Sequence, residues 1–253
     1  MPSNYRKVKD NVEGLKRENI ISEASAKNFS RKSDRKVAMP SFDDVAYDPI
    51  FTCIVVDKSA SMKSCLNAVL DSHPRMLDAL RGSAVTRNGA HFVSQYLFDD
   101  SMTTLHDAEA LSVEPGSDKV TVLNGNNFKP KWGTKLYNAL FTVLQDMLTL
   151  LQEARNEGLS PKLSITCITD GKDGGSTVKP DEIRSLIQEL KTKNILRSSV
   201  LVALNNGSFS RSAAVEIRER IGFDETLNCA QSSSREIREK FLMASQSSVA
   251  KMQ

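Results

Sequence analysis

Five oxygen-bearing side chains stand at positions from which they could bind one metal ion. They are Asp57, Ser59, Ser61, Thr134 and Asp170. Carboxylate and hydroxyl oxygens are the hard donors that Mg²⁺, Mn²⁺ and Ca²⁺ take in proteins. The sequence therefore predicts a divalent-metal site, provided that the fold brings three separate stretches of the chain to one place.

The elements that flank these residues are predicted to do so. An apolar run from 51 to 56 leads into Asp57, and another from 163 to 169 leads into Asp170, which is typical of buried strands. An apolar stripe at helical spacing predicts a helix from 136 to 151, directly after Thr134. In an open α/β sheet, ligands bind at the carboxyl edge, where strands end and helices begin. All five donors are thus expected around one spot.

The rest of the chain repeats this alternation. Further strands are predicted at 92–98, 103–105, 120–123 and 199–204, and further helices at 62–80, 180–190, 211–221 and 234–247. Pro74 predicts a kink or a break in the first of these helices. The pattern indicates an α/β fold with a doubly wound, mostly parallel central sheet that is flanked by helices on both faces. We assign this domain to residues 41–253.

Residues 1–40 differ in composition from the domain that follows. They hold ten Lys and Arg against five Asp and Glu, whereas the whole chain of 253 residues has a net charge of only +3. We interpret this segment as a basic, flexible N-terminal arm. A contact of the arm with an acidic partner or a nucleic acid is kept as an alternative.

Composition otherwise indicates an ordinary soluble protein, with 40% hydrophobic residues. The four cysteines are scattered and form no C-x-x-C pair, so neither a disulfide framework nor a zinc site is expected. No apolar N-terminal segment predicts secretion, and no stretch is long enough to span a membrane. We therefore expect a cytoplasmic protein, and the sequence does not indicate its oligomeric state.

The ordered set Asp57-x-Ser59-x-Ser61, Gly133-Thr134 and Thr169-Asp170-Gly171 resembles the signature of the von Willebrand factor A (VWA) domain family. That signature is the metal-ion-dependent adhesion site, and the resemblance extends from about Ile50 to Val249. It implies that Ser59, Ser61 and Thr134 contact the metal through their hydroxyls. It also implies that Asp57 and Asp170 act through water or as acceptors behind these ligands.

A cation held mainly by neutral hydroxyls keeps much of its charge and an open coordination position. We expect Mg²⁺ (or Mn²⁺ or Ca²⁺) there, bridged to an Asp or Glu of a partner protein, so the chain is interpreted as a binding module and not as an enzyme. In the family, such binding can be coupled to movement of the last helix. The compact form resembles bacterial tellurium-resistance-associated (TerY-like) VWA proteins, which implies an adaptor in a stress or defence system.

Two alternatives remain open at this point. One is a metal-dependent phosphotransferase or hydrolase with Asp57 as nucleophile, although that chemistry uses Asp-x-Asp and this chain has Ser59 at the second position. The other is a scaffold tethered to nucleic acid through residues 1–40.

Four neighbours of the candidate ligands also carry predictions. Lys58 is expected to face solvent, Asp173 to be a turn residue, and the pair Asp99-Asp100 to form a solvated turn. Trp132 is interpreted either as a rim contact or as ordinary packing.

Overall fold

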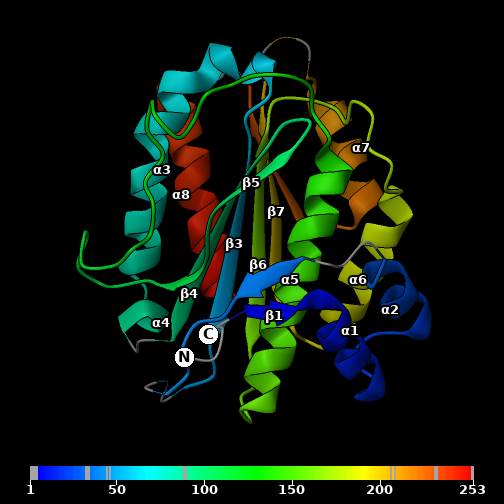
Figure 1. Cartoon of the computed structure of the whole chain (residues 1–253). Helices are drawn as coiled ribbons and strands as arrows, with labels where there is room; N and C mark the ends of the chain where they lie inside the picture. Colours follow the sequence, from blue (N-terminus) through cyan, green and yellow to red (C-terminus); the bar gives the residue numbers. More distant parts are fainter. Residues whose placement is uncertain are drawn as a thin grey trace.

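A six-stranded sheet forms the centre of the computed structural model, which describes residues 5–31, 35–43, 45, 47–87, 90–205, 207, 209–230 and 233–251 (Figure 1). Its strands, in spatial order, are β5 (Met102–Ala110), β4 (His91–Phe98), β3 (Ile50–Asp57), β6 (Lys162–Thr169), β7 (Leu196–Leu204) and β8 (Glu225–Cys229). Only β5 runs antiparallel to its neighbour, and all the other pairs are parallel. Parallel neighbours end at the same edge, which is the edge where the candidate ligands were predicted.

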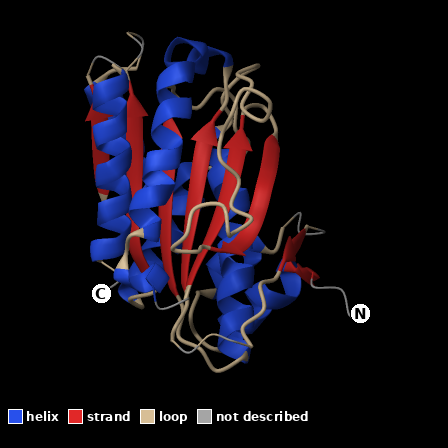
Figure 2. Ribbon diagram, turned by 90° about the vertical axis from the view of Figure 1, so that its left-hand side faces the viewer, coloured by secondary structure: helices blue, strands red, loops and turns tan. Residues whose placement is uncertain are grey.

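Helices cover both faces of this sheet (Figures 1 and 2). On one face lie α3 (Leu66–Arg81) and α8 (Ser234–Ala250), and on the other lie α5 (Leu136–Asn156), α6 (Pro180–Thr192) and α7 (Arg211–Ile221). Two short helices, η1 (Ala60–Cys65) and α4 (Ala84–Arg87), lie before and after α3. The predicted doubly wound α/β fold is confirmed.

The central strand β3 explains why the sequence prediction worked here. All eight of its residues are buried, because helices cover both of its faces and strands β4 and β6 pair with both of its edges. Phe51 and Val55 point into the hydrophobic cluster under α5, whereas Ile54 and Val56 point into the cluster under α3 and α8. A strand that is buried on both faces needs a continuous apolar run, and this is the pattern in the sequence.

The described part of residues 1–40 packs against the body, so the prediction of a flexible arm is wrong there. It forms β1 (Tyr5–Lys7), α1 (Val8–Arg17), α2 (Glu23–Phe29) and β2 (Lys36–Ala38), and β1 pairs antiparallel with β2. Val8, Val12 and Leu15 are fully buried in the same cluster as α5. They recur at helical spacing on one face of α1. This apolar stripe indicates a packed helix, whereas the prediction of a flexible arm was based on the basic composition of the segment. Phe29 stacks on Phe141 with ring centroids 4.4 Å apart.

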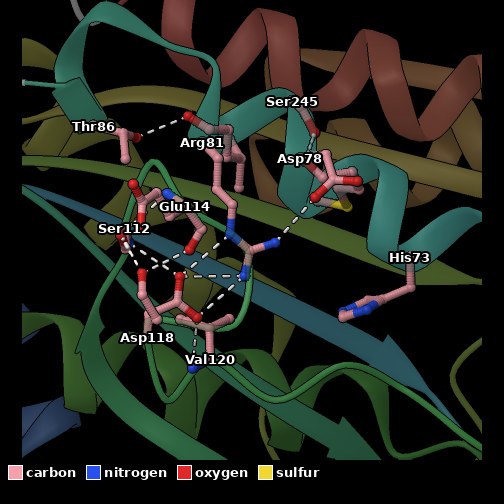
Figure 3. A network of polar contacts seen from close by, with 12 residues as sticks. His73, Asp78, Arg81, Thr86, Ser112, Glu114, Asp118, Val120 and Ser245 are labelled. Carbon is pink, nitrogen blue, oxygen red and sulfur yellow. Dashed lines mark hydrogen bonds and ion pairs between the residues drawn. The ribbon is translucent and has the colours of Figure 1, made fainter.

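The segment between β5 and α5 contains no strand at 120–123, contrary to the prediction. Figure 3 shows what holds its first part instead: the Arg81 guanidinium of α3 contacts Asp118 at 3.1 Å and Asp78 at 3.1 Å. The Asp118 carboxylate also accepts hydrogen bonds from the backbone N–H groups of Ser112 and Val120. The ion pair therefore fixes this loop on the helix.

Side chains also take the backbone groups that a strand would have paired. The His73 Nδ1 accepts a hydrogen bond from the Leu123 N–H (3.3 Å), and the Gln95 side-chain amide donates to the Thr121 carbonyl (2.9 Å). The segment consequently runs beside α3 and delivers residues 129–134 to the carboxyl edge of the sheet (Figure 1).

Helix α3 continues through Pro74, so the predicted break is wrong. His73, Met76 and Leu77 are buried around the proline, and the Ser245 hydroxyl of α8 donates to the Met76 carbonyl at 3.1 Å. Packing on both sides of the proline stabilises the helix where the proline removes a backbone donor. None of the described helices has the length and apolar character that a bilayer crossing requires.

We expect Leu15→Ala to lower the free energy of unfolding by about 2–4 kcal/mol, because it leaves a cavity between α1 and α5. Urea unfolding measures the change, and Lys9→Ala on the exposed face of α1 serves as the matched control. If the two substitutions had equal effects, the described packing of the N-terminal segment would be incorrect.

His91 is buried and makes hydrogen bonds through both ring nitrogens, to Thr86 and Thr52, each at 2.8 Å. Because the Thr86 hydroxyl donates to the Leu80 carbonyl, the His91 Nδ1 is the donor and its Nε2 accepts from Thr52. Burial lowers the pKa of His91 and of His73 to about 4.

Histidine NMR titration should therefore find both rings neutral down to about pH 5. Since the unfolded histidines take up protons at about pH 6.5, these two groups should remove stability as the pH falls from about 6.5 towards 4. A titration of either ring near pH 6.5 in the folded protein would contradict the structure.

Candidate metal centre

Two central strands bring the carboxylates of the predicted site together. β3 and β6 are paired neighbours up to Val56 and Ile168, and both Asp57 and Asp170 are completely buried just beyond that point. The Thr169 hydroxyl donates to the Asp57 Oδ2 at 2.6 Å and joins the two strand ends.

The other oxygen of Asp57 shapes the loop that follows β3. The Ser59 N–H donates to the Asp57 Oδ1 at 2.7 Å, so both carboxylate oxygens have protein partners. Burial raises the pKa of Asp57 to about 6, against the hydrogen bonds from Thr169 and Ser59, and the charge of Asp170 raises it further. The carboxylate thus occupies a position where a nearby positive charge would favour its ionised form.

The serine hydroxyls form a chain of contacts that ends on the second carboxylate. The Ser61 Oγ donates to the Asp170 Oδ1 at 2.7 Å, and the Ser59 Oγ lies 3.0 Å from the Ser61 Oγ. Because the Ser61 proton is given to Asp170, Ser59 is the donor in the contact between the two serines. Ser59 and Asp170 are buried, whereas Ser61 between them is exposed, so the chain of oxygens reaches the surface at Ser61.

Thr134 completes the set from the loop that precedes α5. Its carbonyl accepts a hydrogen bond from the Gly174 N–H at 2.6 Å. Its hydroxyl faces Gly171, where a Cβ atom would lie 3.6 Å from the Thr134 Oγ1. The structure therefore places the hydroxyl beside the residue that follows Asp170, and all five predicted residues lie at one edge of the sheet.

Backbone contacts hold the loop before Thr134 against the end of β3. The Lys131 N–H donates to the Lys58 carbonyl at 2.8 Å, and the Ala60 N–H donates to the Trp132 carbonyl at 3.0 Å. At Gly133 the loop passes so close to Asp100 that a Cβ atom would lie 2.7 Å from the Asp100 Oδ1. A side chain at position 133 would displace the Asp100 carboxylate, which accepts a hydrogen bond from the Gly133 N–H.

Lys58 and Asp99 form an ion pair, contrary to the predictions of a solvent-facing lysine and a solvated turn at Asp99. The Lys58 Nζ lies 3.2 Å from the Asp99 Oδ2, and only 18% and 4% of the two side chains are exposed. Burial raises the pKa of Asp99, but hydrogen bonds from Ser101 and Lys58 outweigh it, so that the pKa falls below its usual value. The Lys58 charge is therefore neutralised beside the site.

Asp173 caps the helix that starts after Thr134. Its carboxylate accepts hydrogen bonds from the backbone N–H of Tyr137 (3.2 Å) and of Ser176 (3.1 Å). The first backbone N–H groups of a helix have no partner within the helix, so this contact stabilises the start of α5. The interpretation of Asp173 as a turn residue agrees with these contacts.

The donor set can be compared with what a small divalent cation requires. In the described part of the chain, no three His, Cys, Asp or Glu side chains gather in a metal-binding group, so a metal at this edge would depend on hydroxyls. Neighbouring ligands of an octahedral Mg²⁺ with bonds of about 2.1 Å lie about 3.0 Å apart. The separation of the two serine oxygens, 3.0 Å, fits that spacing.

Sequence comparison gives no relative: no protein-family profile matches the chain, and no curated protein matches it significantly. Solved structures do resemble it. The pilus adhesin SpaC from Lactobacillus rhamnosus GG, in an open conformation, is similar with a TM-score of 0.51 and 11% identity, over 85% of this chain and 31% of that one. This chain shares the fold of the matched part of SpaC.

Two further similar structures are of proteins or domains whose names refer to the von Willebrand factor. The ArnB paralog VWA2 from Sulfolobus acidocaldarius has a TM-score of 0.44 and 16% identity, over 75% of this chain and 43% of that one. The vWF domain of the type V pili tip protein Mfa5 from Porphyromonas gingivalis has a TM-score of 0.35 and 14% identity, over 66% and 55% of the two chains. The chain thus spans less than two thirds of the length of each of these proteins. At sequence identities this low, the similarity concerns the fold alone.

Asp173→Ala should lower the free energy of unfolding by about 1–2 kcal/mol in buffer that contains a chelator, because the cap of α5 is lost. Chemical unfolding measures this loss, with Lys172→Ala as the neighbouring exposed control. A loss that occurred only in the presence of Mg²⁺ would make Asp173 a ligand instead.

Proposed function

We propose that the chain is a divalent-metal-dependent protein-binding module. Ser59, Ser61 and Thr134 hold Mg²⁺ (or Mn²⁺ or Ca²⁺) through their hydroxyls, with Asp57 and Asp170 behind them. An Asp or Glu of a partner protein fills the remaining position. The observation that carries this proposal is the chain of oxygens from Ser59 through Ser61 to Asp170, which opens to the surface at the carboxyl edge of the sheet.

The two carboxylates have different tasks in this proposal. Asp57 positions the serine loop, because one of its oxygens accepts from the Ser59 N–H and the other from Thr169. Asp170 orients the Ser61 hydroxyl, which accepts from Ser59 and keeps one further lone pair for a cation. The bound cation supplies a positive charge that compensates two buried carboxylates and attracts a third from outside.

The same contacts argue against an enzyme with Asp57 as nucleophile. Such chemistry needs a free carboxylate oxygen and a second acid close by. Both oxygens of Asp57 are engaged, Asp99 is paired with Lys58, and Asp173 caps α5. Each carboxylate near the site therefore has a structural task, which supports binding rather than catalysis.

A tether to nucleic acid through residues 1–40 also loses support. Arg6, Arg31 and Arg35 of this segment pair with acidic residues of the body, at 2.9, 2.9 and 2.8 Å. Charges that are already paired contribute little to phosphate binding. From the resemblance to TerY-like proteins we further propose that the module acts as a cytoplasmic adaptor in a bacterial stress or defence system.

Saturating Mg²⁺ should raise the thermal unfolding temperature, because a ligand that binds only the folded state stabilises it by about 2.7 kcal/mol at 100 times its Kd. Asp57→Ala and Ser61→Ala should abolish the shift, whereas Ser64→Ala, an exposed serine in the same short helix, should keep it. The readout is the shift on adding metal to each variant, so a general loss of stability does not affect it. Equal shifts in Asp57→Ala and the parent would refute the site.

Partner capture tests the binding role itself. We expect proteins from a lysate of the native host to be retained on the immobilised chain with Mg²⁺ and released by a chelator, as identified by mass spectrometry. The Ser61→Ala variant is the control, and retention that is the same with and without chelator would contradict metal-bridged binding.

A further inference from the structure

We propose that five residues around the candidate metal centre form a second recognition element that selects an acidic segment of a partner protein. They are Lys63, Lys129, Lys131, Trp132 and Lys172, and we call them the lysine–tryptophan rim. This inference rests on the proposed function, because the partner's carboxylate that binds the metal belongs to the same acidic segment and lies at its centre.

The four lysines lie on the three loops that build the site. Lys63 follows Ser61 in η1, Lys129 and Lys131 precede Thr134, and Lys172 follows Asp170 by two residues. All four are exposed, and their side chains make no ion pair or hydrogen bond with any residue that the structure describes. Backbone contacts between 131 and 58 and between 174 and 134 hold these segments together, so the four exposed lysines stand on neighbouring segments.

Nearby acids compensate only part of this positive charge. Residues 58–65 and 124–135 contain no Asp or Glu. Asp99 neutralises Lys58, Asp100 accepts from the Gly133 N–H at 3.3 Å, and Asp173 caps α5. The four rim lysines outnumber the carboxylates of Asp100 and Asp173, so this surface stays positive and attracts a segment with several carboxylates and not only one.

Trp132 adds an apolar contact at the same place. It is 71% exposed and has a φ of +61°, a left-handed conformation that bulky residues rarely adopt. Such a conformation costs about 1 kcal/mol, and Gly or Asn would adopt it more easily. The fold thus carries an indole that it does not bury, on a backbone that would favour another residue. Exposed tryptophan of this kind is typical of an anchor in a binding surface.

The proposed metal position, and not the type of the rim cations, favours protein over nucleic acid as the partner. All rim cations are lysines, and residues 58–65, 124–135 and 170–179 contain no arginine. The guanidinium fork matches carboxylate and phosphate alike, and the lysine ammonium is a hydrated point charge that attracts both. The partner class therefore follows from the carboxylate that the proposed metal position takes. We therefore commit to an acidic protein segment with an apolar side chain that packs on Trp132.

Trp132 is the only tryptophan of the chain, so its fluorescence reports contact with the rim directly. The probe is a synthetic dodecapeptide with five Glu around one Leu, titrated in Mg²⁺ buffer against the same peptide with Gln for Glu. We expect a blue shift with the Glu peptide only. Raising NaCl from about 50 to about 500 mM should weaken its binding at least about tenfold, because salt screens exposed charges.

Variants separate the rim from the metal site, with a fluorescein-labelled Glu peptide as the anisotropy probe. Trp132→Asn and the quadruple Lys→Gln variant of the rim should each bind at least about fivefold more weakly. Both should keep the full Mg²⁺ shift in thermal unfolding, and Trp132→Asn should unfold no earlier than the parent. Lys36→Gln, an exposed lysine of β2, is the control.

Each of the other possible outcomes contradicts one specific part of the two proposals. If Mg²⁺ stabilises the chain but the Glu peptide gives no blue shift, or if the rim variants bind it as the parent does, the rim proposal fails and the metal site stands. If a twelve-nucleotide single strand shifts the emission and the Glu peptide does not, the partner class is wrong. If Mg²⁺ has no effect on any variant, the proposed function itself fails.

Discussion

A single hydrogen bond joins the ends of the two central strands, and the candidate site depends on it. The Thr169 hydroxyl donates to Asp57 at 2.6 Å, across the β3–β6 pair, where both residues are completely buried. Without it, Asp57 would lose a partner for one oxygen, and a buried carboxylate without partners is expensive to keep ionised. With it, the other oxygen is free to hold the Ser59 N–H and so to direct the serine loop towards Asp170. The positions of the Ser59 and Ser61 hydroxyls thus follow from the hydrogen bond that joins the two strand ends.

The residues of this site could be predicted because their signals are local. The apolar run of β3 is continuous since both faces are buried, and the stripe of α5 is long, so the strand end at Asp57 and the helix start after Thr134 were predicted correctly. A parallel sheet then places them at one edge whatever the remaining topology. The same reasoning could not find β8, because Glu225–Cys229 has only five residues and only two of them are buried.

The failures have a common physical cause, which is contact with a distant part of the chain. The run at 120–123 is apolar enough for a strand, but His73 and Gln95 take its backbone groups and place it on α3. Lys58 has the type and position of a solvent-facing residue until Asp99 is brought beside it by the neighbouring strand. The N-terminal segment was judged by its charge, although Val8, Val12 and Leu15 already lay at helical spacing. Only the last of these could have been avoided from the sequence.

The separation of charge at this edge explains how one surface can both hold a cation and attract an acidic partner. The rim lysines and the exposed Asp100 lie outside on the loops, whereas the carboxylates of Asp57 and Asp170 are buried in the interior. If the carboxylates were exposed, they would repel the partner's acid and pair with the rim. Buried behind Ser59 and Ser61, they interact strongly with a cation at short range, and mobile ions screen them less than the surface charges. In the proposed complex, an approaching acidic segment would therefore meet the lysines first and the cation last, so long-range attraction and short-range coordination would act in the same direction.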